Sequence, residues 1–149
     1  MSRTQQMLKN KLDELTKVKG IKHSNLITLD GLLLASDRFQ NGKAQSQNQQ
    51  LAALSANILA MATKNVKIID QEYNLKGIKI EAKFSPDQSK DLTILITEVH
   101  SNVLLMTIYA SEINQGLLMY EIEDSISKIR DIIQDKDLTE EFLKIGSIT

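Results

Sequence analysis

The side chains that could do chemistry are few and scattered. The two histidines, His23 and His100, lie in a predicted strand and a predicted turn, and no serine or carboxylate motif surrounds either of them. Two isolated histidines in a chain without cysteine argue against a metal site, because zinc sites gather several such ligands. Glu121, Glu123 and Asp124 lie off the apolar stripe of a predicted helix, so we interpret them as its solvated flank. These residues predict neither a catalytic centre nor a metal site.

No phosphate-binding loop is visible either. The run Gly42-Lys43-Ala44 lacks both the upstream glycine and the following hydroxyl residue of a nucleotide-binding loop. Arg38 follows a predicted buried strand, and it can be interpreted as a charge-stabilising finger or, as is more common, as a solvated loop residue. The sequence therefore predicts a protein that is not an enzyme and that uses no cofactor.

Composition indicates one ordered domain over residues 1–149. Of the 149 residues, 42% are hydrophobic and 25% are charged, which excludes a disordered chain. A formal net charge of −1 argues against nucleic-acid binding driven by bulk charge. Cysteine is absent, and no apolar run reaches the ~18–20 residues that a membrane span requires. Because no signal peptide is visible either, we expect a cytoplasmic protein without direct membrane insertion.

Hydrophobic periodicity predicts the order of helices and strands. The predicted elements are a helix that ends before Gly20, strands at 21–29 and 32–35 joined by an Asp30-Gly31 turn, a polar loop at 37–47, a helix at 48–64, strands at 76–84, 92–99 and 103–110, and a helix at 114–133. This order predicts a mixed α/β (α+β) domain built on an antiparallel meander. The expected core covers about 7–134, and 135–149 is a tail that could add a short helix.

The predicted helix at 48–64 carries more apolar surface than one sheet needs. Its apolar and small residues span roughly 200°, about twice the arc of an ordinary surface helix. It is either a central core helix, or a helix covered on one side by its own sheet and on the other by a second subunit. Ala52, Ala53, Ala56 and Ala60 would let two helix backbones approach closely. Together with the alternating strand at 76–84, this arc predicts a dimer.

Four segments resemble the roadblock / dynein light chain domain family. Gly20-Ile21 followed by Ile27-Thr28-Leu29-Asp30-Gly31-Leu32-Leu33-Leu34-Ala35-Ser36 is similar to its first hairpin, and Leu51-Ala52-Ala53-Leu54-Ser55-Ala56 is similar to the start of its second helix. Asn102-Val103-Leu104-Leu105-Met106 resembles its last strand, and Asn114-Gln115-Gly116-Leu117 resembles the entry to its last helix. The match covers about 8–133. The bacterial and archaeal branch, which regulates GTPases, is the most similar.

The resemblance implies a single αββαβββα domain with a five-stranded, mostly antiparallel sheet. It also implies a symmetric dimer in which the second helices and third strands of two protomers pair. Family members act as non-enzymatic platforms: dynein cargo-binding light chains, subunits of the lysosomal Ragulator scaffold, and bacterial polarity proteins that activate a Ras-like GTPase. The first hypothesis is thus a homodimeric regulatory or scaffold protein that binds a small Ras-like GTPase. The alternatives are a dynein-type or membrane-complex adaptor without GTPase-regulating activity and, third, a small-ligand sensor.

Two sets of site residues follow from the second helix and the third strand. The partner in the dimer is the chain itself or a related roadblock subunit, and the predicted dimer contact consists of Leu51, Ala52, Ser55, Ala56, Leu59, Ile78 and Ile80. The outward face of the second helix is the candidate surface for the GTPase, and by angular position it carries Gln49, Gln50, Ala53, Asn57, Ala60 and Lys64.

Overall fold

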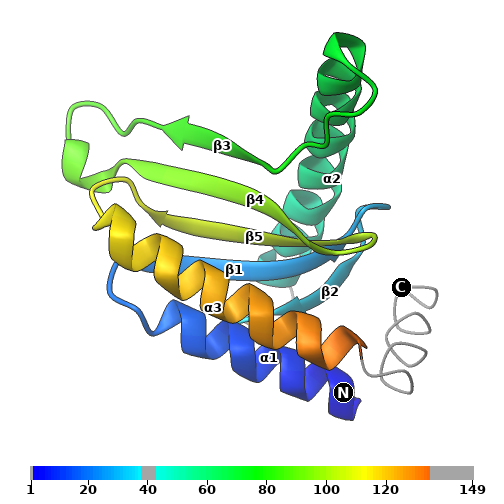
Figure 1. Cartoon of the computed structure of the whole chain (residues 1–149). Helices are drawn as coiled ribbons and strands as arrows, with labels where there is room; N and C mark the ends of the chain where they lie inside the picture. Colours follow the sequence, from blue (N-terminus) through cyan, green and yellow to red (C-terminus); the bar gives the residue numbers. More distant parts are fainter. Residues whose placement is uncertain (1, 38–42, 135–149) are drawn as a thin grey trace.

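The computed structural model describes residues 2–37 and 43–134 of the chain. Its elements follow one another as α1 (Arg3–Thr16), β1 (Ile21–Thr28), β2 (Leu33–Ser36), α2 (Lys43–Ile69), β3 (Gly77–Ala82), a single 3-10 turn (Gln88–Lys90), β4 (Leu92–His100), β5 (Val103–Ala110) and α3 (Gln115–Gln134) (Figure 1). The predicted αββαβββα order is therefore confirmed.

The five strands form one antiparallel sheet in the order β2-β1-β5-β4-β3. The pairs β1–β2, β3–β4 and β4–β5 are consecutive in the chain, whereas α2 separates β2 from β3, and β5 lies in the middle of the sheet between β1 and β4. The Asp30-Gly31 turn joins β1 to β2 as predicted, with Gly31 at φ +90°, a backbone conformation that glycine adopts without a Cβ clash. Strands β2 and β3 are the two edges of the sheet.

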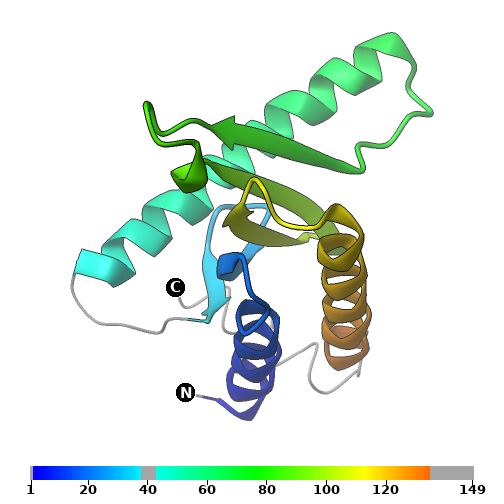
Figure 2. The same ribbon diagram turned by 90° about the vertical axis from the view of Figure 1, so that its left-hand side faces the viewer.

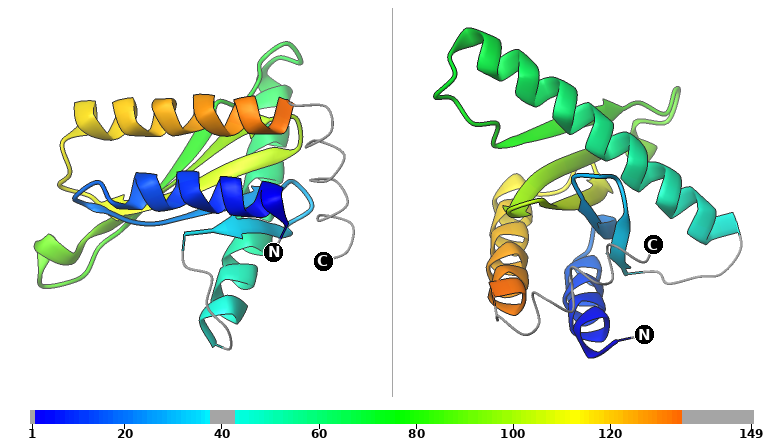
Figure 3. Two further views of the ribbon diagram at one scale, coloured as in Figure 1. Left: turned by 90° about the horizontal axis from the view of Figure 1, so that it is seen from below. Right: turned by 90° about the vertical axis from the view of Figure 1, so that its right-hand side faces the viewer.

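Helices α1 and α3 cover one face of the sheet side by side (Figures 1 and 3). Leu8, Leu12 and Leu15 recur at helical spacing on α1 and are buried together with Leu118 and Ile122 of α3. The N-terminus of α1 has a capping box in which the Ser2 hydroxyl accepts a hydrogen bond from the Gln5 backbone N–H. This layer is the larger of the two cores, and it buries Val103, Leu105 and Tyr109 of β5.

Helix α2 lies alone on the opposite face, where it crosses the strands obliquely (Figures 2 and 3). A second, smaller core forms beneath it from Ile27, Ala52, Leu59, Ile96, Leu104 and Met106. The C-terminal end of α2 extends beyond the β3 edge (Figure 1). One helix therefore covers this face only in part.

Two boundaries differ from the sequence prediction. The helix predicted at 48–64 is longer at both ends, from Lys43 to Ile69, so the polar loop predicted at 37–47 is wrong from Lys43 onward. Lys, Ala and Gln are good helix formers even without an apolar period, and this explains the early start. The tail predicted at 135–149 lies outside the described residues, and the boundaries of the single domain stay a prediction.

Candidate functional site

The α2 helix has three sides, and one of them faces the sheet of its own protomer. Ala52, Ser55, Ala56 and Leu59 lie on this side and are buried. The Ser55 hydroxyl donates a hydrogen bond to the Met106 sulfur on β5 at 3.5 Å. These four residues belong to the predicted dimer contact, but the structure places them inside the protomer. Whether they also contact a second subunit stays a prediction.

A second side, here called the apolar flank, is formed by Leu51, Leu54, Ile58 and Met61. Leu51 is partly buried, whereas Leu54, Ile58 and Met61 are 60%, 38% and 68% exposed. At ~100° per residue these side chains fall within one arc of the helix. Three large exposed apolar side chains on one helix side are typical of a protein-protein contact.

The neighbouring part of the sheet is also incompletely covered. Ile80, Ile94 and Ile108 pair across β3, β4 and β5, and all three are only partly buried. We call this row the isoleucine strip. Ile78, the other predicted dimer residue on β3, pairs with Ile96 one step closer to α2 and is also partly buried. The structure thus places Ile78 and Ile80 on the incompletely covered face.

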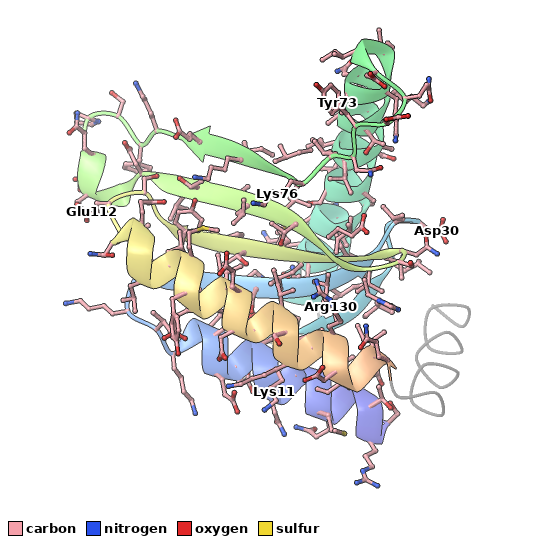
Figure 4. The ribbon with its side chains drawn as sticks, viewed as in Figure 1. Lys11, Asp30, Tyr73, Lys76, Glu112 and Arg130 are labelled. Carbon is pink, nitrogen blue, oxygen red and sulfur yellow. The ribbon has the colours of Figure 1, made fainter. Side chains whose placement is uncertain are left out.

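The third side of α2, the polar flank, carries Gln49, Gln50, Ala53, Asn57, Ala60 and Lys64. All six are exposed, as the angular prediction requires of an outward face. The polar flank points toward the end of the sheet where the β1–β2 turn lies, because a Cβ on Gly31 would stand 3.0 Å from the Ala53 Cα. Figure 4 shows Asp30 at this end of the sheet. The apolar flank consequently faces the other way, along the strands toward the isoleucine strip.

The β3 edge and the projecting end of α2 complete this region. β3 forms hydrogen bonds only with β4, so its outer edge from Gly77 to Ala82 is unpaired within the described part of the chain. Beyond this edge, Ile68 and Ile69 of α2 are 81% and 76% exposed, and Tyr73 lies near them at the far end of the helix (Figure 4). Sequence reasoning missed these residues because it ended the helix at Lys64. The apolar spacing of Val66 and Ile69 was the signal that could have extended it.

Polar chemistry is sparse in the same region. No three His, Cys, Asp or Glu side chains within residues 2–37 and 43–134 lie close enough to hold a metal ion. Burial raises the pKa of Tyr109, and a hydrogen bond to Asp124 raises the pKa of Lys128, but both residues lie on the side of the sheet away from α2. None of the described helices is both long and apolar enough to cross a membrane.

The family profile of the Roadblock/LC7 domain matches residues 7–110. The chain belongs to the Roadblock/LC7 family. Proteins of this family are generally non-enzymatic regulators or adaptors, which agrees with the expectation from the sequence. No curated protein sequence matches this Roadblock/LC7 chain significantly.

Solved structures of Roadblock/LC7 proteins share the fold. MglB of Myxococcus xanthus superposes with a TM-score of 0.71 at 24% sequence identity, over 90% of this chain and 92% of that chain. A Roadblock/LC7 domain of Streptomyces avermitilis gives a TM-score of 0.69 at 13% identity, over 83% and 94%. A structure described as MglB with tetrameric arrangement gives 0.68 at 14% identity, over 95% and 94%. At these identities the likeness shows a common fold.

Proposed function

We propose that this Roadblock/LC7 chain forms a symmetric homodimer whose two α2 helices together bind a small Ras-like GTPase. One observation carries the proposal: the apolar flank of α2, the isoleucine strip and the unpaired β3 edge are adjacent, and all three are incompletely covered in the protomer. A second copy of the same chain could cover all three at once. The assembly would act as a platform, and any nucleotide chemistry would belong to the GTPase.

A two-fold axis at the β3 edge accounts for each exposed feature. Antiparallel pairing of two β3 strands would join the two sheets and remove both open edges. Because α2 extends beyond β3, its C-terminal end would lie over the partner's sheet and cover the partner's isoleucine strip. The two α2 helices would then run antiparallel with their apolar flanks in contact. Ile68 and Ile69 of one helix would pack near Leu54 and Ile58 of the other, and this contact explains why these side chains are exposed in the protomer.

The polar flank stays outside this dimer. The two copies of Gln49, Gln50, Ala53, Asn57, Ala60 and Lys64 would form one surface across the two-fold axis, with small, amide and single charged side chains that suit a modest interface. Since a two-fold surface presents the same residues twice near one axis, one bound GTPase would block the second site. The family resemblance and the MglB-like fold support a small GTPase as the occupant.

The test is equilibrium binding between the purified chain and the small GTPases of its source organism, each loaded with GDP or a non-hydrolysable GTP analogue. Ala60→Glu places a bulky charge on the polar flank without touching either core, and we expect it to weaken binding by about 100-fold. Ala60 suits this test better than Ala53, whose backbone is in close contact with the Gly31 turn.

Ser127→Glu is the matched control, because it adds the same charge at an exposed position of α3. We expect this variant to bind like the wild type. Equal binding by a folded, dimeric Ala60→Glu variant would move the GTPase site away from α2. If no GTPase binds the wild-type dimer in either nucleotide state, the adaptor hypothesis replaces the regulator hypothesis.

A further inference from the structure

An aromatic side chain is exposed just beyond the C-terminal end of β3. Phe84 follows Ala82, the last residue of β3, and is 52% exposed. Its backbone N–H donates a hydrogen bond to the Asp91 carboxylate at 2.7 Å, and the Lys90 ammonium lies 4.9 Å from the centre of its ring. These contacts hold Phe84 in a defined position, although much of its side chain is in contact with water.

The alternation of the strands places Phe84 on the side of the sheet that carries α2. Ile78 and Ile80 project to this side and pack against the smaller core, and the same alternation continues to Phe84. Lys90 lies on this side too, because it precedes Ile94 of β4, which also packs against the smaller core, by an even number of positions. The ring and the ammonium therefore lie on the face that α2 covers only in part.

The other end of β3 borders a hollow beneath α2. Figure 1 shows the β3–β4 loop and the projecting end of α2 at opposite ends of β3, and Figure 4 shows Lys76 at the start of this strand. The hollow has a volume of about 410 Å³ and is lined by Leu59, Thr63, Asn74, Leu75, Lys76 and Glu98. A cavity of about 150 Å³ already accommodates benzene, so one aromatic side chain fits here.

The wall of this hollow is partly apolar and is held in place. Leu59 is buried and Leu75 is partly buried, and both belong to the smaller core. The Lys67 ammonium of α2 donates hydrogen bonds to the Gln71 carbonyl oxygen at 2.7 Å and to the Asn74 Oδ1 atom at 3.1 Å. These bonds tie the segment before β3 to the helix, so the hollow exists in the protomer without a partner.

Antiparallel pairing of two β3 strands brings the exposed ring and the hollow together. Residues that are directly opposite in such a pair project to the same side of the sheet, so an even-numbered position faces an even-numbered one when both α2 helices lie on one side. β3 spans Gly77–Ala82, and the two registers nearest to full overlap put Phe84 of one chain opposite Asn74 or Lys76 of the other. Both positions line the hollow.

The charges at the two ends are complementary. Lys90 lies against the Phe84 ring, so its ammonium would approach the exposed Glu98 carboxylate when the ring enters the hollow of a second copy. Within residues 2–37 and 43–134, Glu98 forms no ion pair. Lys76 also lines the hollow, and its long stem allows its ammonium to turn toward solvent.

We propose that Phe84 of one chain fills the hollow beneath α2 of a second copy, with Lys90 beside Glu98, and that this contact occurs twice in the dimer. The contact rests on the dimer of the proposed function and fixes its register, because a larger slip of the strands would leave the ring outside the hollow. It also favours a second copy of this chain over a related subunit that has no aromatic residue at this position.

Disulfide cross-linking tests the placement, because the chain contains no cysteine of its own. Two double variants combine Phe84→Cys with Asn74→Cys or with Lys76→Cys. Within one chain these positions lie at opposite ends of β3, roughly 20 Å or more apart at ~3.4 Å per residue, whereas a disulfide spans less than about 7 Å. Any disulfide must therefore join two chains.

We expect one of the two double variants to give at least about tenfold more covalent dimer on a non-reducing gel than a matched control. The control combines Phe84→Cys with Ser127→Cys, an exposed position of α3 on the other side of the sheet.

The affinity of the dimer tests the ring itself. Phe84→Ala should raise the dissociation constant by about 50-fold, because a half-exposed aromatic side chain is lost twice per dimer. Tyr120→Ala, which removes a 67% exposed aromatic side chain from α3, should leave the constant unchanged. Thr63→Phe fills the hollow from its own helix, so it should weaken the wild-type dimer but have little further effect in the Phe84→Ala background.

The outcomes separate this contact from the dimer on which it rests. A wild-type chain that sediments at 16.8 kDa would overturn the proposed dimer and this contact with it. A wild-type dimer in which neither double variant cross-links above the control would overturn this contact alone. So would a folded Phe84→Ala variant that keeps the wild-type dissociation constant. Because no GTPase is present, these results are independent of the GTPase binding experiment.

Discussion

Replacing Leu54 by aspartate should separate the dimer while leaving each protomer folded. Leu54 is 60% exposed in the protomer, so its side chain contributes little to the core of its own subunit. Complete burial of a leucine is worth about 2 kcal/mol, and burial of the exposed part in a dimer is therefore worth about 1.2 kcal/mol. A symmetric interface contains the residue twice, so the substitution removes about 2.4 kcal/mol from association.

That loss alone raises the dissociation constant by about 60-fold. Two carboxylates without partners at the contact add a desolvation penalty, so an increase of more than about 100-fold is expected. Sedimentation equilibrium at micromolar concentration should give twice 16.8 kDa for the wild type and 16.8 kDa for Leu54→Asp. Asn57→Asp, which adds the same charge on the polar flank, should remain dimeric. A Leu54→Asp variant with wild-type mass and affinity would refute the assignment of the apolar flank to the dimer contact.

Two further results are expected. Ala56→Arg should unfold the protomer rather than only separate the subunits, because Ala56 is only 3% exposed and packs against its own sheet. Urea denaturation followed by circular dichroism should show a large loss of stability. A folded monomeric variant would contradict this burial. Burial raises the pKa of Tyr109 above its ordinary 10.0, so the unfolded chain ionises first and the free energy of unfolding should fall as pH rises above about 10. Tyr109→Phe should flatten that fall in urea titrations at about pH 9 and 11.

The strands of the sheet could be predicted from the sequence because each one is specified by a pattern within a few neighbouring residues. Alternation on β3, continuous apolar runs on β4 and β5, and the glycine of the β1–β2 turn each act over a few residues. Their predicted order is confirmed strand by strand. The two ends of α2 could not be predicted from the apolar periodicity. The helix continues beyond its apolar stripe at both ends, where the helix propensity of the residues extends it.

The orientation of α2 was the main part of the site that sequence reasoning could not settle. An apolar arc of roughly 200° fits two rotations of the helix, one with the leucines inward and one with the alanines inward. The structure has the alanines inward, since Ala52 and Ala56 are buried and Leu54 is exposed. The polar flank was predicted correctly as an exposed face, because it lies on the side of the helix opposite the centre of the apolar arc. The contact of His23 with Asn48 joins residues 25 positions apart, and no local pattern shows it.

The central claim is that two copies of α2 form one surface that receives a single small GTPase. Sedimentation velocity of the full chain mixed with an excess of a purified small GTPase from the same organism, loaded with a non-hydrolysable GTP analogue, measures this directly. The account predicts a complex of one GTPase with two copies of the 16.8 kDa chain, and no such complex for Ala60→Glu. A complex of one GTPase with one chain, or two GTPases bound independently to one dimer, would contradict it.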